Sequence, residues 1–204
     1  MSLSVRAFDS ESVSPPKGLS DFQWPASFTD GSPLDLEIGC GVGWHPIRYA
    51  QRNPQRRLIA IEHTREKFES FHGRYEKHAL DNLLPIHADA IRWVTHAIKP
   101  ESLDRAFLLY PNPEPGNPSK RWLRAPFFHR LLETMKPGAT IQLATNIESY
   151  FKEALEYGTE YWKLKIVEQR ILTQPIPEDI PRTHFEKKYL ERGETCFDVT
   201  FRKS

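Results

Sequence analysis

The stretch LDLEIGCGVG, residues 34–43, decides the fold. Its first five residues form an apolar run that is interrupted only by acids, which predicts a β-strand over Leu34–Ile38. Three glycines then alternate with other residues at Gly39, Gly41 and Gly43, and an amphipathic segment follows. Glycine lets the chain turn tightly and lets a ligand approach the backbone closely. A strand, a glycine-rich turn and a helix in this order favour a Rossmann-like α/β domain.

Outward from this stretch, short apolar runs alternate with longer amphipathic segments, the pattern of strands alternating with helices. The alternation predicts a mostly parallel sheet with helices on both faces. No obvious helix separates the last two strands, so we expect that pair to be antiparallel. The predicted strands are Leu34–Ile38, Leu58–Ile61, Leu83–His87, Leu103–Tyr110, Ala139–Ala144, Leu164–Glu168 and Thr195–Arg202, and the predicted helices are Pro46–Arg52, Arg65–His78, Ala90–Ala97, Lys120–Met135 and Ile147–Gly158.

The length and composition predict a single cytoplasmic domain. Residues 31–204 suffice for one domain with its own core, whereas residues 1–30 are Ser- and Pro-rich and are expected to form a poorly ordered or helical N-terminal extension. No apolar run is long enough to cross a bilayer, so no membrane partner is expected. Cys40 and Cys196 have no zinc-ligand spacing, and no metal is expected. The net charge of +1 means that any basic surface must arise by local segregation of charge.

The glycine spacing and two acids point to a cofactor that contains a nucleoside. The spacing is G-x-G-x-G, whereas G-x-G-x-x-G is the dinucleotide-binding pattern, and S-adenosylmethionine has a ribose but no phosphate. Glu62 ends the second predicted strand, where a carboxylate can accept hydrogen bonds from both ribose hydroxyls. Asp89 and the Ala90 backbone follow the third strand and can contact an adenine edge, although Asp89 can equally be a helix N-cap. These features favour the seven-stranded methyltransferase fold with S-adenosylmethionine as cofactor.

With these elements in place, the sequence resembles the tRNA (guanine-N7)-methyltransferase family from about Leu34 onward. Its motifs recur in order and at the expected distances, and the later ones are more specific than the glycine loop. They are LEIGCGVG at 36–43, Ile61-Glu62, Asn82-Leu83, Asp89-Ala90, LYPNP at 109–113 with Lys120-Arg121, Ala144-Thr145-Asn146 with Tyr150, and PRTHFE at 181–186.

The resemblance implies a set of site residues for each ligand. It implies cofactor binding by Glu37, Gly39, Gly41, Gly43, Glu62, Asp89, Ala90 and Tyr110. It implies substrate binding by Asn112, Lys120, Arg121, Asn146, Thr183 and Glu186, with Asn112, Asn146 and Arg121 acting in catalysis and tRNA as the partner. Asn112 and Asn146 stand where the family has aspartates, and the family's basic N-terminal arm has no counterpart here.

Two other functions are compatible with these departures. Asn112-Pro113 partly matches the Asn-Pro-Pro-aromatic motif of enzymes that methylate amino or amide nitrogens, which suggests a small-molecule or protein acceptor. The loss of both aspartates also suggests a non-catalytic module that binds cofactor or RNA. Trp122, Phe127, Phe128, Leu131 and Leu132 have helical spacing, which predicts core positions rather than a base-stacking surface.

Overall fold

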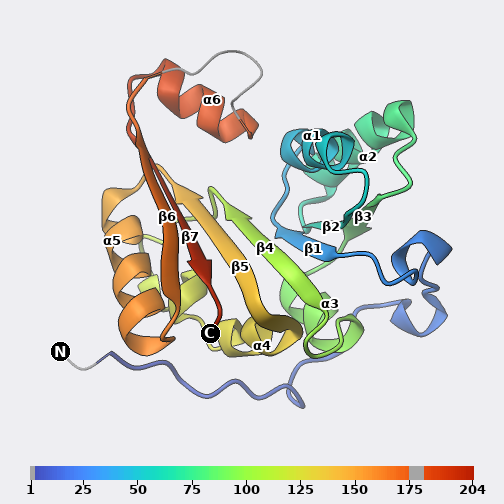
Figure 1. Cartoon of the computed structure of the whole chain (residues 1–204), viewed down its shortest axis with the longest axis horizontal. Helices are drawn as coiled ribbons and strands as arrows, with labels where there is room; N and C mark the ends of the chain where they lie inside the picture. Colours follow the sequence, from blue (N-terminus) through green and yellow to red (C-terminus); the bar gives the residue numbers. More distant parts are fainter. Residues whose placement is uncertain (1–2, 175–181) are drawn as a thin grey trace.

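The computed structural model describes residues 3–174 and 182–204, which form an α/β fold around one seven-stranded sheet (Figure 1). The strand order is β3-β2-β1-β4-β5-β7-β6. Strands β1 to β5 pair in parallel, and β7 is antiparallel to both β5 and β6. The strands are β1 (Leu34–Ile38), β2 (Arg57–Glu62), β3 (Leu83–His87), β4 (Leu103–Leu109), β5 (Met135–Thr145), β6 (Lys165–Leu172) and β7 (Cys196–Arg202). The predicted architecture and the antiparallel final pair are confirmed.

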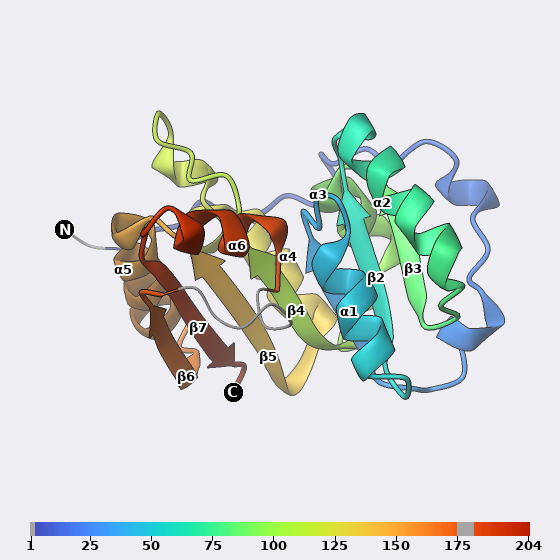
Figure 2. The ribbon, with the colours of Figure 1, turned by 90° about the horizontal axis from the view of Figure 1, so that it is seen from above.

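Helices cover the two faces of the sheet unequally. The helices α1 and α2 lie over the half formed by β1 to β3, whereas α3, α4 and α5 pack on the opposite face (Figures 1 and 2). Buried Phe71 belongs to the core beneath α1 and α2, and Phe128 belongs to the core beneath the other helices. The helices are α1 (Trp44–Arg52), α2 (Arg65–His78), α3 (Ala90–Ala97), α4 (Phe127–Thr134), α5 (Glu148–Glu156) and α6 (His184–Glu191). The upper face of β5 and β7 consequently carries only α6 among the described helices, at one end of the strands (Figure 2).

Residues 3–30 run along the molecule and include two short 3₁₀ helices, Leu19–Asp21 and Ala26–Phe28. The rings of Phe22 and Trp24 contact each other and Trp93 of α3, with centroids 5.3–6.0 Å apart. Aromatic pairs at this separation add to the stabilisation from burial. The division into an extension at 1–30 and a domain at 31–204 stays a prediction.

Two predicted elements were wrong. The helix expected over Lys120–Met135 is reduced to α4, because Ala125 precedes Pro126 and is extended, and a residue before proline disfavours the helical conformation. The residues before it form two 3₁₀ turns, Pro118–Lys120 and Trp122–Arg124, and Met135 already belongs to β5.

The expected absence of a helix between the last two strands was also wrong, because α6 lies there. The Thr183 side chain caps its first turn by accepting a hydrogen bond from the Glu186 backbone N–H at 3.0 Å. Threonine followed three residues later by glutamate is a sequence signal for a helix start, so the sequence did contain evidence for α6. In the part of the chain that the structure describes, no helix has both the length and the apolar character needed to span a bilayer.

Candidate functional site

The glycine loop is held in place by the end of β2. The Glu62 carboxylate accepts one hydrogen bond from the Gly41 N–H and another from the Thr64 N–H, each at 2.8 Å. Gly43 packs so tightly that a Cβ there would lie 2.0 Å from Cδ2 of Phe71, and its φ of +83° is rare for other residues. The loop therefore needs glycine at Gly43 for packing, and Glu62 fixes its position.

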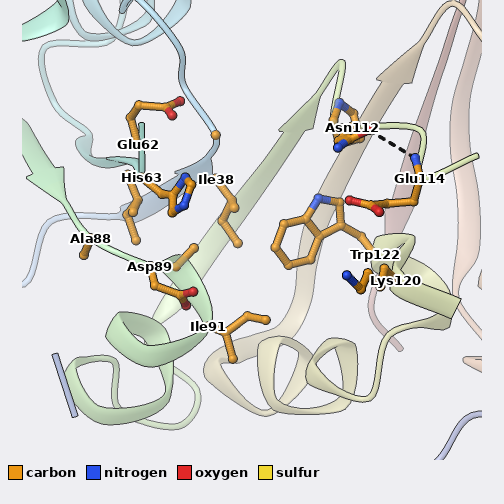
Figure 3. A pocket seen from close by; sticks show the side chains of 14 residues that line it. Ile38, Glu62, His63, Ala88, Asp89, Ile91, Asn112, Glu114, Lys120 and Trp122 are labelled. Atoms are coloured by element: carbon orange, nitrogen blue, oxygen red, sulfur yellow. Dashed lines mark hydrogen bonds between the residues drawn. The ribbon is translucent and has the colours of Figure 1, made fainter. Parts of the chain in front are cut away.

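A first cavity, which we call the strand-end pocket, opens beyond the carboxyl ends of β1 to β4. Its volume is about 390 Å³, within the range of small-molecule sites. Carboxyl ends of parallel strands are where open α/β sheets bind ligands. The lining residues are Ile38, Gly39, Ile61, Glu62, His63, Ala88, Asp89, Ala90, Ile91, Pro111, Asn112, Glu114, Lys120 and Trp122 (Figure 3).

The two walls of the strand-end pocket differ in origin. On one wall lie Glu62 and Asp89, from the ends of β2 and β3 (Figure 3). The Asp89 carboxylate accepts a hydrogen bond from the Arg92 N–H at 3.0 Å, so it caps α3 as well as lining the pocket. Across the cavity lie Asn112 and Trp122, which follow β4 (Figure 3).

Trp122, on the second wall, has a role that its predicted core position did not include. Trp122 was expected in the core, and its ring does contact Phe127, with centroids 5.8 Å apart. It nevertheless lines the strand-end pocket, because the 3₁₀ turn at this point replaces the helix from which the prediction was made. Asn112 is exposed, and its side-chain oxygen accepts a hydrogen bond from the Glu114 N–H at 3.2 Å.

A second cavity, the glycine-loop pocket, lies on the other side of the same loop and has a volume of about 200 Å³. Gly39 lines both cavities. The start of α6 forms one side of the pocket, where the His184 ring contacts the Trp44 ring at a centroid distance of 5.4 Å. Segments far apart in sequence are therefore brought together here. The lining residues are Glu37, Gly39, Cys40, Gly41, Val42, Trp44, His45, Lys67, Leu109, Thr183, His184 and Phe185.

Glu37 is buried at the edge of the glycine-loop pocket and contacts Nδ1 of His45 at 2.7 Å. Burial raises the pKa of the nearby Cys40 thiol, with the charges of Glu37 and Glu62 acting in the same direction. Cys40 is therefore a neutral thiol and a weak nucleophile. No cluster of three or more histidine, cysteine, aspartate or glutamate side chains suited to a metal ion occurs among residues 3–174 and 182–204.

Glu186 is part of a buried hydrogen-bond and ion-pair network. It is fully buried, and its carboxylate accepts hydrogen bonds from the Tyr110 hydroxyl at 2.9 Å and from the Arg182 guanidinium. Arg182 also pairs with buried Asp198 of β7. Burial and the adjacent Glu186 raise the pKa of Tyr110, so that its hydroxyl remains a donor. This network attaches α6 to β4 and β7.

Arg121 and Asn146 are also engaged with protein groups. The Arg121 guanidinium lies 3.3 Å from Glu153, donates a hydrogen bond to the Pro113 carbonyl at 2.8 Å, and stacks over the Tyr150 ring. The Asn146 amide donates a hydrogen bond to the Glu194 carboxylate at 2.7 Å.

The structure thus distributes the predicted site residues over several places. The strand-end pocket contains Gly39, Glu62, Asp89, Ala90, Asn112 and Lys120, and the glycine-loop pocket contains Glu37, Gly39, Gly41 and Thr183. Gly43, Tyr110, Arg121, Asn146 and Glu186 make the packing and hydrogen-bond contacts described above and line neither cavity. Pro181, the first residue of the motif at 181–186, lies outside the described residues.

Comparison with known proteins supports the same fold and chemistry. A family model described as "Putative methyltransferase" matches residues 31–199. The tRNA (guanine-N(7)-)-methyltransferase of Nitrosospira multiformis is 33% identical over 178 residues, which cover 86% of this chain and 77% of that protein. The protein of the same name from Roseobacter denitrificans is 31% identical over 175 residues, covering 84% and 74% respectively.

Solved structures show the fold at lower sequence identity. The 16S rRNA methyltransferase KamB aligns with a TM-score of 0.69 at 19% identity, covering 90% of this chain and 95% of that chain. An S-adenosylmethionine-dependent methyltransferase from Aquifex aeolicus aligns with a TM-score of 0.57 at 16% identity, covering 97% and 90%.

Proposed function

Because the chain belongs to the family described as "Putative methyltransferase", we propose that it methylates N7 of a guanosine in tRNA. Its similarity to tRNA (guanine-N(7)-)-methyltransferases supports this acceptor. The methyl donor in this proposal is S-adenosylmethionine. A cytoplasmic location is also part of this proposal.

One observation carries this proposal: the strand-end pocket joins residues suited to a nucleoside cofactor with residues suited to an acceptor base. Glu62 and Asp89 provide acceptors on one wall, and Asn112, Lys120 and Trp122 provide polar and aromatic groups on the other (Figure 3). A donor and an acceptor placed across one cavity can be aligned for direct transfer, and such alignment supplies most of the rate in a displacement reaction.

The residues present fit the proposed cofactor. Each Glu62 oxygen accepts one backbone N–H and keeps a second lone pair, so the carboxylate can also accept from ribose hydroxyls. Asp89 and the Ala90 backbone border the same cavity at the adenine end of the proposed arrangement. When bound, S-adenosylmethionine supplies an electrophilic methyl group on a sulfonium centre. The protein's task is to orient the two ligands.

The acceptor side needs to hold a guanine without removing a proton from N7, because that nitrogen already carries a lone pair. Asn112 and Asn146 stand where the family has aspartates and bring no charge, but each lies beside a glutamate. Glu114 lines the strand-end pocket with Asn112, and Glu194 accepts a hydrogen bond from Asn146. We infer that both carboxylates, Glu114 in the pocket lining and Glu194 outside it, contribute negative potential that favours positive charge on the methylated ring.

The test is incubation with radiolabelled S-adenosylmethionine and separate pools of tRNA lacking 7-methylguanosine, protein and metabolites. We expect label in tRNA, and mass spectrometry of the digested nucleosides should identify 7-methylguanosine. Label confined to protein or metabolites would move the acceptor to an amino or amide nitrogen, for which Asn112 would have to free its amide oxygen from the Glu114 N–H. Cofactor binding without label in any pool would favour a non-catalytic module.

A further inference from the structure

A third cavity of about 270 Å³, the arginine pocket, lies between α1 and the upper face of β4 and β5. Its lining residues, within the part of the chain that the structure describes, are His45, Arg48, Tyr49, Arg52, Asn53, Arg105, Phe107, Gln142, Arg170 and Arg182. They include five arginines and, among these described residues, neither aspartate nor glutamate. In a chain with a net charge of +1, this is a local concentration of basic side chains.

The fold produces this concentration from separate elements. Arg48 and Arg52 are four residues apart and share one face of α1, while Arg105 comes from β4 and Arg170 from β6. Arg105 and Phe107 point to the same face of the sheet, and Phe107 pairs with Gln142 of β5. Helix α1 lies beside β4 in Figure 2, and its Arg48 and Arg52 line the cavity together with Arg105 of β4.

Acids outside the described lining contact two of the pocket's arginines. Arg182 pairs with Glu186 and Asp198, and Arg170 lies 3.4 Å from both Asp198 and the exposed Glu168. Asp35 accepts hydrogen bonds from Tyr49 and Arg56. Arg105 donates one Nη1 hydrogen bond to the Tyr49 hydroxyl at 3.0 Å. A guanidinium has five N–H donors in a planar fork that matches phosphate oxygens, so such a contact leaves donors for an anion.

The arginine pocket is also connected to the candidate site. His45 lines both the arginine pocket and the glycine-loop pocket, and Arg182 directly precedes Thr183, which lines the latter. The glycine-loop pocket therefore adjoins the arginine pocket at His45 and the strand-end pocket at Gly39.

We propose that the arginine pocket binds the phosphodiester backbone of the tRNA beside the nucleotide to be methylated. This inference rests on the proposed tRNA substrate. Phosphate contacts position a nucleic acid without reading its sequence, which is the role required next to a site that selects one base.

The test compares the wild type with the double variant Arg105→Gln/Arg170→Gln. These side chains lie at the surface of the pocket, and removing them leaves Asp35 paired with Arg56 and Asp198 paired with Arg182. The control variant Lys77→Gln/Lys152→Gln also removes two positive charges, from exposed positions on α2 and α5. Fluorescence anisotropy measures the affinity for tRNA between about 50 and about 200 mM salt, and each lost phosphate contact lowers the slope of log K against log salt by about 0.7–0.9.

We expect the pocket variant to bind tRNA roughly ten-fold more weakly at the lowest salt, with a salt slope smaller by one to two, whereas the control retains wild-type values. Calorimetry with S-adenosylhomocysteine should give the same affinity in all three proteins. If the wild type methylates tRNA and the pocket variant keeps both the wild-type affinity for tRNA and its salt dependence, this inference is wrong, whereas the proposed function is unaffected. A wild type that neither binds nor methylates tRNA would overturn the proposed function and this inference with it.

A further arm distinguishes RNA from a small anion. Inorganic phosphate at millimolar concentration should compete only weakly with tRNA, because a single phosphate engages few of the arginines. Saturable binding of inorganic phosphate to the wild type, lost in the pocket variant and without a change in tRNA affinity, would overturn the assignment to RNA.

Discussion

The strand-end pocket and the arginine pocket differ in the charge of their linings. The first contains the acids Glu62, Asp89 and Glu114, whereas the described lining of the second contains five arginines and no acid. The first is built from segments that follow β1 to β4, and the second from α1, β4, β5, β6 and the residue Arg182 before α6. One region can recognise a ligand through directed hydrogen bonds, and the other through charge.

Under the proposed function, the contrast would allow a nearly neutral chain to bind a polyanion. Bulk composition gives no excess of positive charge, and the fold separates the charges instead. Binding in the strand-end pocket should therefore depend little on salt, while binding in the arginine pocket should depend on it strongly. Variants that affect one region, the other or both can test this separation.

The largest effect is expected for Glu186→Ala, which should disturb both regions. Glu186 holds Tyr110 at the end of β4 and Arg182 of the arginine pocket, and its removal leaves part of a buried ionic network without its partner. Breaking a buried ion pair costs about 3–5 kcal/mol of unfolding free energy. Denaturant unfolding measures this loss of unfolding free energy. Glu191→Ala, at an exposed position on the same helix, is the control, and its unfolding free energy should stay close to that of the wild type. Equal stability of the two variants would contradict the structural role of Glu186.

The next effect in size is expected for Gly43→Ala, at the junction between the glycine loop and α1. The added Cβ would collide with the buried Phe71 ring and would adopt an unfavourable positive φ, so we expect a loss of about 3 kcal/mol in unfolding free energy. Gly73→Ala is the matched control, because it is helical and has no atom within 4 Å of the added Cβ. Thermal unfolding should show a lower midpoint for the first and an unchanged or higher midpoint for the second.

A smaller effect is expected for Glu62→Gln, which changes the strand-end pocket and the glycine loop but not the arginine pocket. Loss of the charge weakens hydrogen bonds to the ribose, and the affinity for S-adenosylhomocysteine should fall roughly ten-fold by calorimetry. The salt slope of tRNA binding should stay at the wild-type value. If the slope changed as well, the two pockets would not act as separate recognition regions. Glu66→Gln, in the exposed first turn of α2, serves as the control for charge.

The smallest effect is expected at Asn146, and it refines the view of the acceptor side. Restoring the family aspartate with Asn146→Asp would place two carboxylates together, because Glu194 lies 2.7 Å from the Asn146 amide. At this partly exposed position we expect a loss of about 1 kcal/mol in stability and a lower turnover of tRNA. Adding Glu194→Gln should restore both. Higher activity in the single Asp variant would show that Glu194 does not supply the missing charge.

Local patterns were sufficient to predict the sheet and the placement of Glu62 and Asp89 at one edge of it. The apolar runs of β1 and β3 were assigned with their observed ends, and Glu62 and Asp89 do line one cavity because strand ends meet at one edge of a parallel sheet. Their positions follow from residues close by in sequence. The roles of these residues in binding stay predictions.

Features that depend on distant contacts could not be predicted in the same way. Arg121 was expected to meet a ligand, but it pairs with Glu153 on α5, which lies 32 residues further along the chain. The arginine pocket was missed because its lining residues come from five segments of the chain, and Arg48 and Arg52 are the only two of its arginines that form a local pattern. In both cases the packing of helices and strands determines which residues meet, and the spacing of residues in the sequence does not reveal that packing.

The order of the strands also has a consequence for the way in which the protein acquires its structure. Strand β6 hydrogen-bonds only to β7 among the described strands, and β7 follows it in the sequence while lying between β6 and β5. During synthesis on the ribosome, β6 must therefore wait without a partner until β7 has emerged, and its side chains Ile166, Val167 and Ile171 remain exposed even afterwards. The half of the sheet with the glycine loop can assemble earlier. We therefore expect a nascent chain to form the strand-end pocket before Arg170 reaches its position in the arginine pocket. Strand β6 should need protection by chaperones for the longest time.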